Sequence, residues 1–213
     1  EWLQIGYQQP PYFNQVRFPV AKQPPFGQER SFMRIYLCPA LMDWLVFLVL
    51  FAVLYGAGER GFTTRQCFWL GGVFQLTYLV ASLLIGTVLH RRNARGLLIF
   101  CTAACTLLGV GCLVWQAFGP LLAMLALLGI VEAGFFNAFQ TFMRGEAPPG
   151  GLARSVGLYT LAWSLGAGAG VLSSGVVYRW GTGALVGLNT LVGGLILCVL
   201  LVYRPRPTDH PSA

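Results

Sequence analysis

The sequence predicts an all-α membrane protein with six membrane-spanning helices, and three observations carry this prediction. Hydrophobic residues make up 56% of the 213 residues and charged residues only 10%, against about 25% in a typical protein. Six apolar stretches follow one another along the chain, and each comes close to the roughly 20 residues that a membrane helix needs. The Lys and Arg residues lie between these stretches. A soluble domain of this size would need a much larger charged surface.

The positions of the spans follow from the breaks between apolar stretches. Gly119 and Pro120 separate the third span from the fourth, and the run from Pro148 to Gly151 separates the fourth from the fifth, because Pro and Gly interrupt helices. We expect the six spans at about residues 40–58, 68–89, 96–118, 121–143, 155–178 and 183–203.

The distribution of cations gives the expected orientation. With the amino terminus in the cytoplasm, eleven of the 14 Lys and Arg residues fall on the cytoplasmic side. Only Arg60, Arg65 and Arg179 fall on the opposite side. Cytoplasmic loops are enriched in cations, so we expect a multi-pass protein with both termini in the cytoplasm, in a bacterial inner (plasma) membrane. Topology thus explains the net charge of +7, and we expect no nucleic-acid partner.

Three parts of the chain are expected. Residues 1–37 contain five prolines and predict an extended cytoplasmic tail without a core, whose last residues, such as Ile35 and Tyr36, would meet lipid in a short interfacial helix. Residues 38–204 form the six-helix domain, and residues 205–213 form a second cytoplasmic tail. Because the chain starts at Glu1 rather than at methionine, we expect a fragment or a processed product.

Glu132 is the most informative single residue for function. It lies near the middle of the fourth span, where an acidic side chain costs roughly 2.5–3.5 kcal/mol on insertion scales. Phe136 and Gln140 follow it at steps of four, so they share its helix face, and Asn137 is close by. Two interpretations stay open: a site for a substrate or a proton, and a structural hydrogen bond to a neighbouring helix.

Polar and aromatic residues on other spans extend this candidate site. They are Gln75, Tyr78 and Tyr55, with Trp163 and Asn189 as weaker candidates. Asp43 and Glu59 lie near the two ends of the first span, and we expect both to be interfacial and solvated. We expect no metal ligand set and no cofactor.

Residues 86–95 resemble the signature of the major facilitator superfamily in the loop between its second and third helices. That signature runs Gly-x-x-x-Asp-Arg-x-Gly and ends with two basic residues. Gly86, Arg91 and Arg95 match it, whereas His90, Asn93 and Ala94 stand where Asp, Gly and the first basic residue belong. The resemblance implies a gating loop, formed here by Gly86, His90, Arg91, Arg92 and Arg95, which latches the amino-terminal helices to the carboxyl-terminal ones. A topology signal alone is the other interpretation of its arginines.

The fifth span is similar to the glycine-rich fifth helix of the same family. It carries a ladder of small residues at intervals of four, namely Ala162, Gly166, Gly170 and Ser174. Small residues let helix backbones approach closely in lipid, and the ladder fits static packing as well as a helix that slides or bends. The Gly-Pro pair of antiporters is absent from this span, as is their arginine from the fourth, which disfavours drug/proton antiport.

The resemblance covers about residues 40–205 and implies the amino-terminal six-helix half of a major facilitator superfamily fold. It implies secondary active transport of a small solute by alternating access, with a proton or a sodium ion as candidate coupling ion. Partners would then be the lipid bilayer and a missing carboxyl-terminal half or a second copy. The alternative is a half-size, non-transporting scaffold or sensor. We expect no enzyme, because His90 and His210 both lie outside the spans.

Overall fold

The computed structural model describes residues 34–147 and 150–203. Within these ranges the chain forms six α-helices and no strand. Their bounds are α2 (Leu37–Glu59), α3 (Thr64–Val88), α4 (Arg91–Val114), α5 (Phe118–Glu146), α6 (Leu152–Arg179) and α7 (Thr182–Val202). All six are long and apolar enough to cross a membrane, so the predicted fold class is confirmed. Residues 1–33 and 204–213, which hold most of both expected tails, lie outside the described residues.

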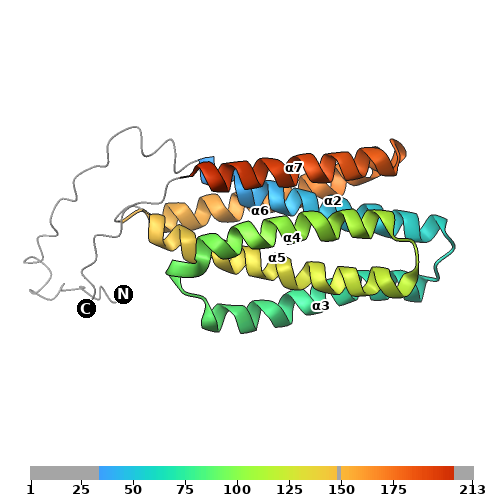
Figure 1. The fold of residues 1–213 in the computed structure, drawn as a ribbon, viewed down its shortest axis with the longest axis horizontal. Coiled ribbons are helices and arrows are strands. Elements are labelled where there is room, and N and C mark those ends of the chain that lie inside the picture. The colour runs from blue at the N-terminus through green and yellow to red at the C-terminus, as the bar shows by residue number, and fades with distance from the viewer. Residues whose placement is uncertain (1–33, 148–149, 204–213) are drawn as a thin grey trace, which may run out of the picture.

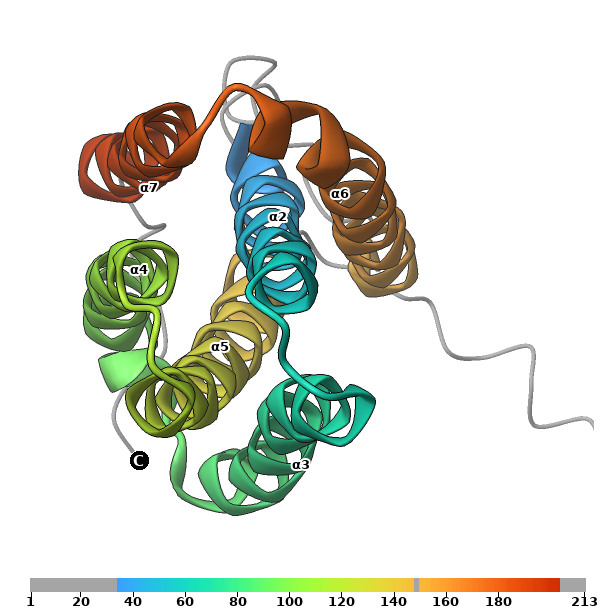
Figure 2. The same ribbon diagram turned by 90° about the vertical axis from the view of Figure 1, so that its right-hand side faces the viewer.

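The helices run side by side and alternate in direction along the chain (Figure 1). The start of α2 and the end of α7 lie at one end of the bundle, together with the α3–α4 and α5–α6 connections. The end-on view in Figure 2 shows α2 between α6 and α7, and α5 between α3 and α4. The most extensive contacts join α2 to α6 and α5 to α3. The pairing is therefore reciprocal between the first three helices, α2 to α4, and the last three, α5 to α7. The middle helix of each set packs on the first helix of the other, so α3 packs on α5 and α6 packs on α2.

Small residues set the closest approach between α6 and α2. A Cβ atom at Gly166 would collide with the backbone of Ala40, and one at Gly170 would lie 2.7 Å from the carbonyl oxygen of Trp44. Ser174 continues the same face and is fully buried. The ladder predicted on the fifth span is therefore the surface on which α2 packs.

Glycine has the same role at two further helix contacts. A Cβ atom at Gly129 of α5 would collide with the backbone of Phe74 and the hydroxyl of Thr77 on α3. A Cβ atom at Gly193 of α7 would collide with the side chain of Thr106 on α4. Because little hydrophobic force drives helices together in lipid, such close van der Waals contacts supply much of the association energy.

Helices α3 and α4 begin four and five residues earlier than the hydropathy of the sequence predicts. Helix α3 starts at Thr64 because Thr63 and Gln66 form a capping box, in which each residue's side chain accepts a hydrogen bond from the other's backbone N–H. Helix α4 starts at Arg91, so only Leu89 and His90 connect it to α3. The arginine-rich run expected as a loop is therefore mostly helix, since arginine is a good helix former and hydropathy registers only the apolar part of a helix.

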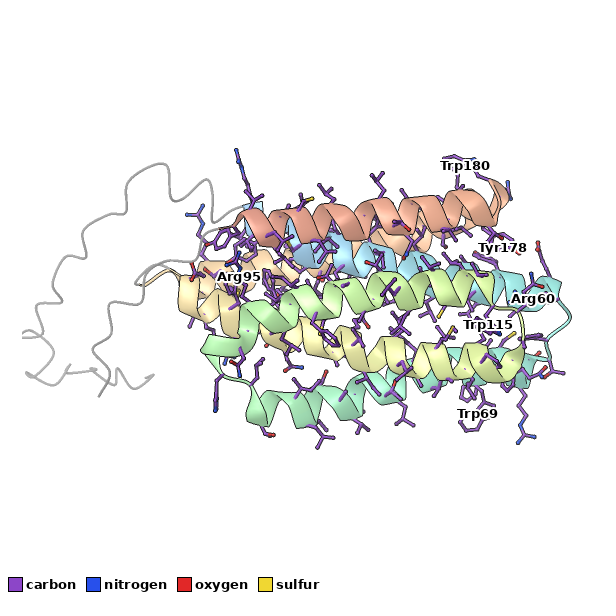
Figure 3. All side chains as sticks on the ribbon, in the orientation of Figure 1. Arg60, Trp69, Arg95, Trp115, Tyr178 and Trp180 are labelled. Carbon is purple, nitrogen blue, oxygen red and sulfur yellow. The ribbon has the colours of Figure 1, made fainter. Side chains whose placement is uncertain are left out.

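Three exposed tryptophans mark the end of the bundle opposite to the start of α2. Trp69, Trp115 and Trp180 are 48%, 50% and 70% exposed, and all three lie near that end in Figure 3. Tryptophan is enriched where a membrane meets water, because the indole ring is apolar with a polar N–H. This end therefore has the composition of a membrane interface.

The residues just before α2 pack inside the protein rather than against lipid. Ile35 is 1% exposed and Tyr36 is 6% exposed. The ring of Tyr36 meets that of Phe139 on α5 edge to face, with centroids 6.0 Å apart. The expectation that these two side chains meet lipid is wrong, because α2 and α5 converge here and cover them.

The α2–α6 contact yields a prediction with a matched control. We expect Gly166→Ala to lower the free energy of unfolding by about 1–3 kcal/mol, because the added methyl group meets the α2 backbone, which cannot move aside. Gly168→Ala, in the same helix but with nothing within 4 Å of its Cβ position, should leave stability unchanged or raise it by up to about 1 kcal/mol. Unfolding in mixed micelles, followed by circular dichroism, measures both. Equal losses in the two variants would contradict the close contact.

Candidate functional site

A cavity of about 350 Å³ lies between α2, α3, α5 and α6. Its lining residues are Asp43, Phe47, Phe74, Gln75, Tyr78, Glu132, Phe136, Gln140, Tyr159 and Trp163. Six of them are candidates from the sequence, namely Glu132, Phe136, Gln140, Gln75, Tyr78 and, as a weaker candidate, Trp163. The structure thus brings most of the predicted set to one place.

The lining residues of each helix follow the periodicity of an α-helix. On α5, Glu132, Phe136 and Gln140 follow at steps of four and all face the cavity. The same step joins Asp43 to Phe47 on α2, Phe74 to Tyr78 on α3, and Tyr159 to Trp163 on α6. Each helix therefore contributes one continuous stripe.

Two acidic side chains meet inside this cavity. Asp43 on α2 is 4% exposed and Glu132 on α5 is 3% exposed, and the two carboxyl groups lie close enough to influence each other. Two neighbouring carboxylates repel each other when both are ionised, and a proton on one of them relieves that repulsion. Two buried carboxyl groups in one cavity are chemically suited to share a proton.

The burial of Asp43 corrects the expectation that it is interfacial and solvated. Helix α2 begins at Leu37 rather than near residue 40, which places Asp43 roughly 9 Å along the helix at 1.5 Å per residue. At that depth its side chain turns toward α5 and Glu132. Glu59, at the other end of α2, is exposed and accepts a hydrogen bond of 2.6 Å from the hydroxyl of Tyr178.

An aromatic wall from α5 and α6 encloses one side of the cavity. Gln140 Nε2 donates a hydrogen bond of 3.1 Å to the hydroxyl oxygen of Tyr159. The Tyr159 ring meets Phe136 edge to face at 6.3 Å and stacks on Phe139 at 5.6 Å between centroids. These contacts fix the position of Tyr159, which the sequence does not single out because only the fold brings α6 beside Gln140.

Three other candidates lie elsewhere. Tyr55 is 53% exposed and its ring lies beside Tyr178, away from the cavity lining. Asn137 donates to the carbonyl oxygen of Ala133 at 2.9 Å and faces α3. Asn189 is fully buried and donates to the carbonyl oxygen of Thr106 on α4, so it joins α7 to α4.

The predicted gating segment is partly accounted for within this six-helix unit. Arg95 Nη2 donates to the carbonyl oxygens of Leu200 and Leu201, at 3.2 Å each, and lies at the end of the bundle where α7 finishes (Figure 3). The last carbonyls of a helix have no partner within the helix, so Arg95 caps α7. Gly86 lies against Asn137, where an added Cβ atom would be 3.3 Å from the amide oxygen.

The rest of that segment, His90 to Arg92, lies at the start of α4. His90 is the N-cap residue of α4 and is exposed. The side chains of Arg91 and Arg92 lie outside the described part of the structure.

Comparison with known proteins decides the family. The family model of the Major Facilitator Superfamily matches residues 35–213. The chain belongs to the major facilitator superfamily. A comparison with the curated proteins finds no match. This superfamily consists of transporters, and each of its six-helix halves is built from two inverted repeats of three helices. The reciprocal pairing of α2 with α6 and of α5 with α3 is the packing that such repeats produce.

The cap on α7 generates a prediction. Arg95→Met should lower the free energy of unfolding by about 1.5–3 kcal/mol, because two carbonyl groups lose a charged donor. Arg65→Met, which removes an exposed arginine from the first turn of α3, serves as the matched control and should change stability by less than about 0.5 kcal/mol. Hydrogen exchange at the end of α7 should also accelerate only in Arg95→Met. Similar behaviour of both variants would show that Arg95 does not cap α7.

Proposed function

We propose that this superfamily member is a secondary active transporter that moves a small solute by alternating access, with the cavity between α2, α3, α5 and α6 as its binding site. The observation that carries the proposal is the convergence of Asp43 and Glu132, both buried, in one cavity of the membrane-spanning helices. Ionisable residues within membrane spans are expensive and mark substrate, ion or proton pathways. Transporters of this kind bind their ligands near the bilayer midplane.

The lining residues divide the work of binding. Glu132 and Asp43 bind a charged group of the solute or a coupling proton, and a sodium ion is the other candidate coupling ion. Gln75, Tyr78 and Gln140 offer hydrogen bonds, while Phe136 offers an apolar surface. Support for these roles comes from their shared position on the cavity wall.

The rest of the machine is proposed from sequence features. The cation distribution supports cytoplasmic termini in a bacterial inner membrane, and His90, Arg91 and Arg92 would then face the cytoplasm as part of a gate. A further six-helix unit, either a carboxyl-terminal half or a second copy, would close the open side of the cavity. Exposed apolar side chains along α3 and α6, such as Leu83 and Leu172, offer a surface on which such a unit or lipid can pack.

A non-transporting scaffold or sensor is the function to be distinguished, and sidedness of labelling distinguishes it without a known substrate. We expect Gln75→Cys, at an exposed position on the cavity wall, to react with a membrane-impermeant maleimide from either side of the membrane. Alternating access opens the cavity to each side in turn, whereas a scaffold would expose it to one side only.

The labelling experiment requires that native cysteines do not react, and it requires a control position. Replacing Cys67 and Cys198 by serine removes the two cysteines that are not buried. Leu83→Cys lies on the same helix and is 69% exposed but outside the cavity lining, so it should react from neither side. Reaction of Gln75→Cys from one side alone, in intact cells and in inverted vesicles, would contradict transport.

A further inference from the structure

We infer that the cavity takes an organic cation that carries a flat aromatic group. This inference deepens the proposed transport function and rests on it, because it names the chemical class of the solute. Three properties of the cavity, namely its charge, its aromatic lining and its size, lead to it independently.

The first property is the sign of the charge. Asp43 and Glu132 are the acidic members of the lining, and none of its described residues is Lys, Arg or His. Charges interact strongly inside a protein because the local dielectric constant is far below that of water. An anion would be repelled by any ionised form of the pair, whereas a cation supplies the counter-charge that the cavity lining lacks.

The second property is the density of aromatic rings. Six of the ten lining residues are aromatic, namely Phe47, Phe74, Tyr78, Phe136, Tyr159 and Trp163. They come from all four helices, so rings surround the carboxyl groups on several sides. The face of an aromatic ring attracts cations, and flat ligands stack on it with favourable geometry. A sugar or a small acid would leave most of this surface without a matching partner.

The third property is the size of the cavity. A volume of about 350 Å³ falls within the range of about 300–1,000 Å³ for sites of small organic ligands. A metal cation is far smaller and needs several ligands at close range, and the described residues contain no group of three or more His, Cys, Asp and Glu that could hold one. An organic cation fills such a volume and supplies the counter-charge at the same time.

The polar side chains fit the same ligand. Gln140 uses its amide N–H to donate to Tyr159, which leaves its carbonyl oxygen to accept a hydrogen bond. Gln75 offers a second amide at the exposed edge of the cavity. A ligand with N–H groups on its cationic centre would find these acceptors close to the carboxyl pair.

A matched pair of probes tests the inference on the intact protein. N-methyl-4-phenylpyridinium and biphenyl-4-carboxylate share a flat two-ring frame and carry opposite charges. We expect the purified protein in nanodiscs to bind the cation saturably and at least about tenfold more tightly than the anion, a difference equivalent to about 1.4 kcal/mol. Equilibrium dialysis with radiolabelled probes measures both affinities. Equal affinities, or tighter binding of the anion, would overturn the inference without any variant being needed.

Variants then locate the site. Glu132→Gln and Asp43→Asn should each weaken cation binding by about tenfold or more, and Phe136→Leu by about two- to thirtyfold. Glu59→Gln removes an exposed acid from the other end of α2, and Phe100→Leu removes a ring that is 65% exposed on α4. Both controls should bind the cation as the parent protein does. Loss of binding in the controls but not in the cavity variants would place the cation elsewhere and overturn the inference.

The outcome for the solute class is separable from the outcome for transport. If Gln75→Cys reacts from both sides while the cation binds no more tightly than the anion, the inference is overturned and transport stands. If the cation is preferred while Gln75→Cys reacts from one side only, transport is overturned and the cavity is a cation-binding site of a membrane sensor.

Discussion

The meeting of Asp43 and Glu132 is the constraint on which the arrangement of this bundle depends. Each carboxyl group costs several kilocalories per mole to bury in an apolar medium unless it finds a partner. The two lie on α2 and α5, and Figure 2 shows α2 between α6 and α7 and α5 between α3 and α4. Their proximity links these two helices inside the cavity. A cavity lined by rings rather than by aliphatic side chains then remains around the pair.

The close contacts of the bundle lie where they leave this cavity open. Gly166 and Gly170 bring α6 against α2, and Gly129 brings α3 against α5. The four helices around the cavity are thus held as two tight pairs, α2 with α6 and α5 with α3. Between the pairs the helices are separated by larger side chains, such as Phe136 and Tyr159, whose rings meet edge to face. Tight packing within the pairs and looser packing between them is what a binding cavity in a helical bundle requires.

Much of this arrangement is present in the sequence as periodicity. Six apolar stretches predict six spans, and the four-residue steps from Glu132 to Gln140 correctly place these side chains on one face. The ladder around Gly166 and Gly170 predicts a close helix contact, although sequence spacing could not say that α2 is the partner. Membership of the superfamily follows from the match over residues 35–213. The partial signature that includes Gly86 and Arg95 lies within this range and indicates the same family.

Other features could not be predicted, for two physical reasons. Hydropathy locates the apolar part of a helix and misses its ends, so it predicts a start for α2 that is too late and places Asp43 at the interface. Helix α2 is also apolar on all sides, so its sequence does not reveal which face meets the cavity. Tyr55 was selected for its chemistry and lies elsewhere for this reason. Tyr159 was missed because only the fold brings α6 to Gln140.

A double-mutant cycle on Asp43 and Glu132 tests the central claim most directly. The free energies of unfolding of the parent protein, Asp43→Ala, Glu132→Ala and the double variant give the coupling between the two side chains. Each single variant should leave the other carboxyl group buried without its neighbour, so the double variant should be more stable than the sum of the single losses implies, by about 0.5–3 kcal/mol. Additivity within about 0.3 kcal/mol would show that the two acids do not interact, and would contradict their coupling across the cavity.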